Sequence, residues 1–153
     1  MGAGARADDM RDSDSLSPRI ARLDFERIVA AVLDRRSTPR LLAPLLAAEA
    51  DWLFNGDPAS WTYAGLRSKR DSILAYLEAF VVEFEQKSLR RLDTLIDGEQ
   101  ACVRYEMELR HRGTGREAKL PFLCFIRLEG DLIVEVSEFS DSASLFRLRD
   151  SQV

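Results

Sequence analysis

The sequence is poor in the residues that build metal centres and histidine-based catalytic triads. It contains one histidine, His111, and two cysteines, Cys102 and Cys124. These are too few to assemble a zinc site or a triad that depends on histidine. His111 lies near a hairpin turn, so we expect it at the surface. The cysteines have no metal-ligand spacing, and we expect them to be small buried thiols in a reducing compartment.

Long apolar segments and an excess of positive charge are also missing. No apolar run approaches the roughly 20 residues that cross a bilayer, and the N-terminus lacks the basic-then-apolar layout of a signal peptide. The 22 basic and 26 acidic residues give a net charge of −4, whereas nucleic-acid binders usually carry a basic excess. We therefore expect a cytoplasmic protein that binds neither membranes nor nucleic acids and requires no cofactor.

The chain has the length and composition of one globular domain. Its 153 residues are 46% hydrophobic, which is enough to bury a sizeable core. Residues 1–16 contain little that could be buried, so we expect a flexible tail followed by a single domain over residues 17–150. The domain should begin at Ser17-Pro18, which is a good start signal for a helix.

The apolar periodicity changes from helical to alternating along the chain. It predicts helices to about residue 36, over 38–46 with a bend at Pro44, and over 68–86, with a short strand at 51–54 between the last two. Ser68 and Asp71 resemble a capping box for the third helix. Four alternating segments, separated by tight turns, predict an antiparallel meander over 89–96, 101–110, 119–128 and 132–139. This order of elements indicates an α+β fold in which helices cover one face of a curved sheet.

Three stretches within this order resemble the SnoaL-like branch of the nuclear transport factor 2 (NTF2) superfamily, whose relatives include ketosteroid isomerase, polyketide cyclase and limonene epoxide hydrolase. They are residues 52–65, with the Gly56-Asp57-Pro58 loop, residues 93–106, and residues 135–141, with the acidic-aromatic-x-Asp ending at 138–141. The resemblance implies an NTF2-like conical barrel, with a curved antiparallel sheet wrapped around N-terminal helices. One departure is Lys69, which stands where the family often has glycine.

The resemblance also implies an internal pocket that binds a small apolar molecule, since concave apolar pockets are common ligand sites. The aromatic residues expected to line the pocket and bind the substrate are Trp52, Phe54, Trp61, Tyr63, Phe80 and Phe84. Each of these side chains could instead simply fill the core.

Four polar residues resemble the catalytic set of the limonene epoxide hydrolase relatives. Arg104 and Glu106 are two apart on one strand and so share a face, Glu138 would supply a second carboxylate, and Asn55 would help to hold a water molecule. Two carboxylates bridged by an arginine could divide the roles of acid and base. Leu53 replaces a tyrosine of that family, and Asp141 is an alternative acid if a bulge turns it inward.

Alternation alone leaves two orientations of this strand open. If Val103, Tyr105, Met107 and Leu109 pack under the helices, the charged residues lie outside and form ordinary cross-strand pairs or a dimer contact. If the charged face points inward, the apolar face needs cover from a sheet-to-sheet homodimer. The sequence therefore supports an isomerase, cyclase or epoxide hydrolase that uses carboxylate acid–base chemistry, with a non-catalytic ligand-binding or dimerisation module as the alternative.

Overall fold

The computed structural model describes residues 22–34 and 39–150, so the expected tail and the start of the domain at Ser17-Pro18 lie outside the described residues. The helices are α1 (Arg22–Leu33), α2 (Arg70–Glu83) and α3 (Ser142–Arg149), and the strands are β1 (Leu46–Phe54), β2 (Gly65–Ser68), β3 (Phe84–Asp97), β4 (Gln100–His111), β5 (Glu117–Glu129) and β6 (Leu132–Ser140). In these two segments no helix is long and apolar enough to cross a membrane.

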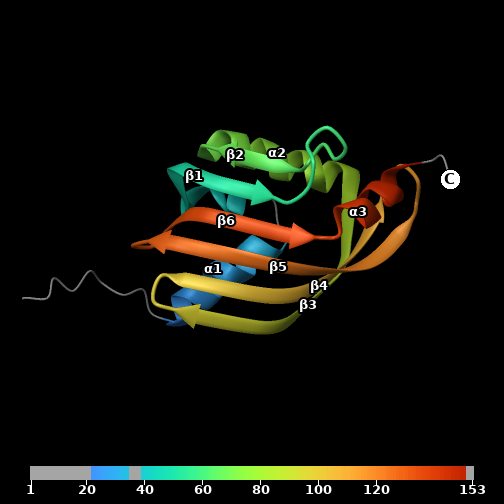
Figure 1. The fold of residues 1–153 in the computed structure, drawn as a ribbon. Helices are drawn as coiled ribbons and strands as arrows, with labels where there is room; N and C mark the ends of the chain where they lie inside the picture. The colour runs from blue at the N-terminus through green and yellow to red at the C-terminus, as the bar shows by residue number, and fades with distance from the viewer. Residues whose placement is uncertain (1–21, 35–38, 151–153) are drawn as a thin grey trace, which may run out of the picture.

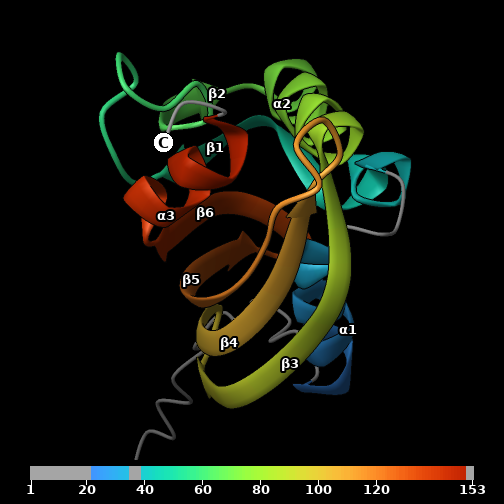
Figure 2. The same cartoon turned by 90° about the vertical axis from the view of Figure 1, so that its right-hand side faces the viewer.

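The strands form one curved, six-stranded sheet in the order β2-β1-β6-β5-β4-β3 (Figures 1 and 2). Strands β3 to β6 are consecutive antiparallel neighbours, which confirms the predicted meander. Strand β1 adds to the other edge of the meander by pairing parallel to β6. The α+β class and the curved sheet expected from the sequence are confirmed.

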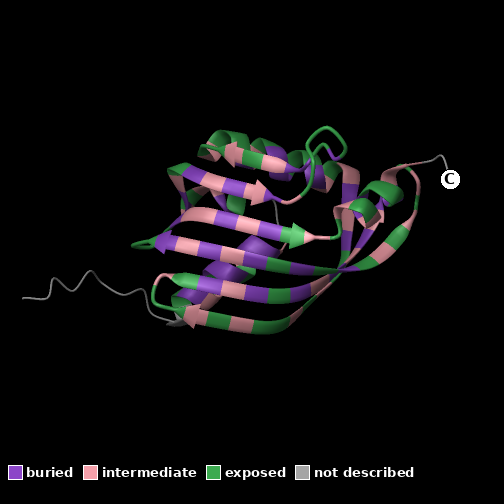
Figure 3. Cartoon of the chain, viewed as in Figure 1, coloured by how far each residue is buried: buried purple, intermediate pink, exposed green. Residues whose placement is uncertain are grey.

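The two faces of the sheet differ in burial. Side chains on β4 and β5 alternate between a buried inner face and a more exposed outer face, as the banding in Figure 3 shows. On β4 the inner residues include Val103, Tyr105 and Met107, each no more than 1% exposed. Helices α1 and α2 cover parts of the inner face, and their apolar residues join the same core. The core therefore lies inside the curve of the sheet.

Three local predictions need correction. The second helix predicted around Pro44 is a pair of short 3-10 turns at Pro39–Leu41 and Ala43–Leu45. Strand β1 then begins at Leu46, five residues before the predicted strand. Because proline lacks an N–H and fixes its own φ, it fits these tight turns better than a helix interior. Strand β2 and helix α3 were not predicted.

The predicted capping box at the start of α2 is also wrong. Ser68 ends β2, and Lys69 occupies the N-cap position without a side-chain hydrogen bond to the helix. Its φ of 77° and ψ of 142° place Lys69 in a backbone region that residues with a Cβ rarely adopt. The geometry that favours glycine is therefore retained at the position where the resembling family often has glycine.

We expect Lys69→Gly to stabilise the domain by about 1 kcal/mol, because the relief of backbone strain exceeds the added entropy of the unfolded chain. Urea unfolding of the two proteins measures this difference. Lys69→Ala is the control, since alanine removes the long side chain but keeps the Cβ. Equal stabilisation by alanine and glycine would show that the backbone of Lys69 is not strained.

Candidate functional site

The centre of the candidate site is Glu138, a carboxylate on the inner face of β6. Its side chain is 1% exposed, and it is one of only three buried polar or charged residues among those described. Its neighbours in the sheet are Cys124 on β5 and Phe54 on β1. Burial of a carboxylate costs free energy unless polar groups donate hydrogen bonds to it. The groups that contact Glu138 therefore determine what it can do.

Two aromatic side chains from different strands donate hydrogen bonds to Glu138. The indole Nε1–H of Trp52 on β1 donates to Oε1 at 2.7 Å. The hydroxyl of Tyr105 on β4 donates to Oε2 at a longer 3.3 Å. Trp52 and Tyr105 are themselves fully buried. Each carboxylate oxygen thus has a neutral donor that fixes its position, and the oxygen bound to Tyr105 has the weaker of the two bonds.

All the aromatic residues predicted to line a pocket are buried inside the domain. Trp52 lies 6.5 Å from Tyr76 between ring centroids, and Tyr76 lies 5.8 Å from Tyr63. Tyr63 in turn contacts Trp61, Phe80 and Phe84. Phe54 is 3% exposed on the same face as Glu138. A continuous set of aromatic rings therefore extends from the carboxylate toward the end of α2.

Arg104 and Glu106 do not join Glu138. They lie on the outer face, where Arg104 Nη2 is 2.5 Å from Asp93 Oδ2 and Arg90 Nη2 is 2.5 Å from Glu106 Oε1. The hydrogen bond from Arg90 lowers the pKa of Glu106 below its usual value. Because inner and outer residues alternate on β4, the burial of Tyr105 and Val103 forces both charged residues outward. The shared arrangement of two carboxylates and an arginine is not assembled.

Asn55 and Asp141 have structural contacts instead of places beside Glu138. The Asn55 amide donates to the carbonyl of Ser140 at 2.9 Å and accepts from its N–H at 3.0 Å, which joins the ends of β1 and β6. Asp141 is the N-cap of α3 and accepts from the Ser144 N–H at 3.1 Å. Hydrogen bonds from the Ser144 side chain and backbone lower the pKa of Asp141. No bulge turns this carboxylate inward.

A second polar cluster surrounds Glu83 at the end of α2. Its carboxylate accepts a hydrogen bond from the Tyr63 hydroxyl and lies 3.1 Å from Nε2 of His111. The other ring nitrogen of His111 accepts from the N–H of Thr114 at 3.0 Å, so Nε2 carries the proton that is donated to Glu83. Burial, and then the hydrogen bond to Glu83, raises the pKa of Tyr63.

The surface location predicted for His111 is therefore wrong, since this residue is 8% exposed. The buried location predicted for the thiols holds for Cys124, whereas Cys102 is partly exposed on the outer face. Tyr105 and Glu83 were not predicted as polar contacts of interest. The alternation on β4 could have predicted both the burial of His111 and the inward direction of Tyr105. These two residues share one face of the strand with Val103, Met107 and Leu109.

Comparisons with known proteins agree with this architecture. The sequence model of the SnoaL-like domain matches residues 25–136. No curated protein matches the sequence. Among solved structures, an NTF2-like protein of unknown function from Burkholderia pseudomallei superposes with a TM-score of 0.70 at 22% identity, over 82% of this chain and 96% of the other.

Two further structures carry names that refer to chemistry or ligands. A candidate SnoaL-like polyketide cyclase from Jannaschia has a TM-score of 0.71 at 10% identity, covering 86% of this chain and 94% of the other. A protein of ketosteroid isomerase-like fold from Catenulispora acidiphila, in complex with trimethylamine, has a TM-score of 0.61 at 15% identity, covering 72% and 82%. At these identities the structural likeness shows the fold alone. The match of the sequence model over most of the domain shows that this chain belongs to the SnoaL-like domain family.

Proposed function

We propose that the domain binds a small apolar molecule inside the curve of the sheet and acts on it as a cofactor-independent isomerase or cyclase. Glu138 is the acid–base group. The observation that carries this proposal is a carboxylate buried among aromatic rings and held by Trp52 and Tyr105. Buried titratable groups with specific partners are frequent at functional sites, because water is excluded there and the geometry is fixed.

The arrangement suits proton abstraction next to a carbonyl group. Oε2 of Glu138 takes a proton from the carbon beside the carbonyl, and the Tyr105 hydroxyl turns from Oε2 to donate a hydrogen bond to the oxygen that gains negative charge. The protonated Glu138 then returns the proton to a different carbon, which completes an isomerisation. In a cyclisation the carbanion attacks a second carbonyl of the same molecule, and Glu138 gives its proton to the new alkoxide. Both the isomerisation and the cyclisation restore the ionised carboxylate of Glu138.

Epoxide hydrolysis is less well supported by the geometry. The expected epoxide-hydrolase arrangement uses a second carboxylate, an arginine and an asparagine that holds water. Arg104 and Glu106 point to the outer face, and both ends of the Asn55 amide bind Ser140. A single carboxylate with a neighbouring hydroxyl is sufficient for the isomerase or cyclase reaction.

A thermal-shift screen of wild type and Glu138→Gln tests whether Glu138 faces a ligand. The panel contains polyketide-like aromatic ketones, steroids, terpene epoxides and fatty acids. Stabilisation of wild type by ketones or steroids, and its reduction in Glu138→Gln, is the expected result. Stabilisation that is equal in both proteins would favour the non-catalytic binding module, in which the pocket holds a ligand without using its carboxylate.

A specific surface feature favours homodimerisation as a second function of the same domain. One row of paired residues crosses the outer face through all six strands: Leu95, Cys102, Phe125, Ser137, Leu53 and Leu66. Leu123 and Phe139 form the neighbouring pair, and each is 43% exposed. Exposed apolar patches of this kind mark interaction surfaces, so we propose that a second copy covers this row.

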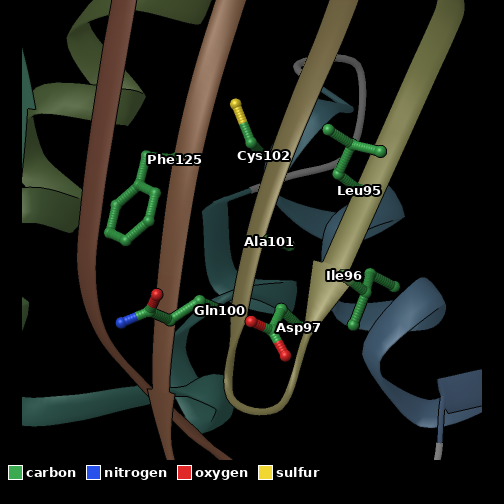
Figure 4. A pocket seen from close by; sticks show the side chains of 7 residues that line it. All are labelled: Leu95, Ile96, Asp97, Gln100, Ala101, Cys102 and Phe125. Atoms are coloured by element: carbon green, nitrogen blue, oxygen red, sulfur yellow. The ribbon is translucent and has the colours of Figure 1, made fainter.

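The groove at one end of the row supports a side-chain contact with that second copy. It has a volume of about 380 Å³ and lies beside the β3–β4 hairpin, where Leu95, Cys102 and Phe125 contribute side chains (Figure 4). Phe125 and Cys102 are direct partners in the β4–β5 ladder. The groove is therefore continuous with the row of paired residues. If one contact buried both the groove and the row, their exposed apolar surface would be removed from water.

We expect Leu123→Glu to raise the dissociation constant of the dimer at least 100-fold. Each copy would bring one unpaired carboxylate into the interface, and the burial of both would oppose association. Sedimentation velocity over a range of concentrations measures the change. Val82→Glu is the control, since Val82 is 74% exposed on α2, away from the sheet face. A wild-type protein that stays monomeric at all concentrations, or an equal effect of the control, would contradict the assignment of this face.

A further inference from the structure

Helix α3 lies at the end of the sheet that holds the candidate site. Tyr105 pairs with Phe122, and Phe122 pairs with Ser140, the last residue of β6. The helix begins two residues later, at Ser142. Because Glu138 is only two residues before Ser140, the carboxylate and Tyr105 both lie close to the start of α3. Figure 1 shows α3 at this end of the curved sheet, beside the β4–β5 hairpin.

One side of α3 is directed into the domain and the other toward solvent. Leu145 is fully buried and Leu148 is 5% exposed, whereas Phe146 is 38% exposed. Both leucines join the apolar core that the inner face of the sheet helps to form, and α3 packs on β4 and β5, so α3 is one of the elements that cover this core. Since Glu138 and Tyr105 are themselves almost inaccessible, a ligand that arrives from water has to displace some part of this cover.

The N-terminal end of α3 is firmly joined to the sheet. Asn55 makes both of its amide hydrogen bonds to Ser140, and Asp141 caps the first turn through Ser144. Gly56 packs so closely against Ser142 that a Cβ on this glycine would lie 3.1 Å from the Ser142 hydroxyl. These contacts hold the junction between β6 and α3 while the helix itself spans only eight residues.

The C-terminal end of α3 is held by the buried Leu148 and by polar contacts near the surface. Arg149 donates from Nη1 to the Thr62 hydroxyl at 2.9 Å, lies 3.9 Å from Glu83 Oε1, and places its guanidinium 4.9 Å from the ring centre of Trp61. The β4–β5 hairpin adds a hydrogen bond from the Thr114 hydroxyl to the carbonyl of Leu148 at 2.6 Å. Arg116 Nη1 on the same hairpin donates to the carbonyl of Arg147 at 2.9 Å and to the carbonyl of Asp150. Individual contacts of this partly exposed kind contribute little free energy and can break without unfolding of the domain.

We propose that α3 is a lid over the Glu138 site, hinged at Ser140–Asp141 and latched at its other end by Arg149, Thr114 and Arg116. The role of this movement in ligand entry rests on the proposed function of Glu138, but the movement itself does not. An isolated two-turn helix has little stability of its own in water. Release of the latch therefore lets α3 leave the inner face while the sheet, which is tied by continuous ladders, remains folded.

Hydrogen exchange by mass spectrometry tests the latch. In Arg149→Met we expect amides of residues 142–149 to exchange about tenfold faster, the ratio that corresponds to the loss of about 1.4 kcal/mol of closing free energy. Residues 101–109 of β4 should exchange as in wild type. Arg147→Met is the control, because Arg147 is exposed on the same helix and its side chain is not in the latch. Thr114→Val provides a second way to open the latch if Arg149→Met does not fold.

Acrylamide quenching of fluorescence links the lid to the site. The chain has two tryptophans, so Trp61→Phe leaves Trp52, the donor to Glu138, as the only reporter. In this background, we expect Arg149→Met to increase the quenching constant of Trp52 several-fold over Arg147→Met. Equal quenching, or exchange of α3 only together with β4, would overturn the proposal. Neither measurement uses a substrate, so an inactive protein with a mobile α3 would reject the proposed function and leave the lid intact.

Discussion

Glu138→Gln should lower the rate of the proposed reaction by about 10²–10⁴-fold, the range typical for loss of a positioned acid–base group. Glutamine has nearly the same shape as glutamate, but its amide cannot accept and return a proton at neutral pH. Its NH₂ group would also face one of the two donors, Trp52 or Tyr105, that hold the carboxylate. The measurement is the loss of the α-proton signal in deuterated buffer, for the ketone that most stabilises wild type.

Glu106→Gln and Arg104→Met are the matched controls for that loss. Both residues were candidates from the sequence, and both have exposed ion-pair partners on the outer face. Their replacement should leave the rate within about twofold of wild type, because surface substitutions away from a site rarely change it. A large loss of rate in Glu106→Gln, with normal activity in Glu138→Gln, would assign the chemistry to the opposite face of the sheet.

Glu83→Ala should destabilise the domain by about 2 kcal/mol, since the His111 N–H would lose its acceptor and the Tyr63 hydroxyl would keep only the carbonyl of Ala79 at 3.2 Å. The carboxylate connects four parts of the chain: the end of α2, the loop that carries Tyr63, the end of β4 at His111 and the end of α3 at Arg149. Its side chain is 24% exposed, so water would replace part of what is lost. This exposure keeps the expected effect below the cost for a fully buried network.

Urea unfolding measures the effect of Glu83→Ala against Glu78→Ala, an exposed position of the same helix. The control keeps the change in helix propensity the same and should alter the free energy of unfolding by less than about 0.5 kcal/mol. If the two variants are equally stable, the cluster around Glu83 contributes nothing beyond ordinary surface contacts. The same result would also weaken the assignment of Arg149 as a latch through Glu83.

The sequence was sufficient to predict the main elements because each carries a local signal. Alternation and the Asp97-Gly98 and Gly130-Asp131 turns predicted the meander, which the register of β3 to β6 confirms. The short β2 and the two-turn α3 were missed because elements of four and eight residues carry too few periodic positions. Their existence depends on contacts with distant parts of the chain, such as the pairing of Leu53 with Leu66.

The candidate site was predicted less completely for a related reason. The family resemblance implied Glu138 and the aromatic residues as candidates, but local pattern left the orientation of β4 open. Tyr105 was placed on the apolar face, and only the register across β4, β5 and β6 brings its hydroxyl to the Glu138 carboxylate. The polar partner of His111, Glu83, is 28 residues away in the sequence. Contacts between distant strands and helix ends cannot be derived from the spacing of residues alone.

The most direct measurement follows the fluorescence of Trp52 in Trp61→Phe while the stabilising ketone is titrated. Because Trp52 donates to Glu138 at 2.7 Å, a ligand that engages this carboxylate should change the emission in a saturable way. We predict that the change disappears in Glu138→Gln. If the ligand stabilises the protein but leaves the emission of Trp52 unaltered, it binds elsewhere, and Glu138 is not the working group of this domain.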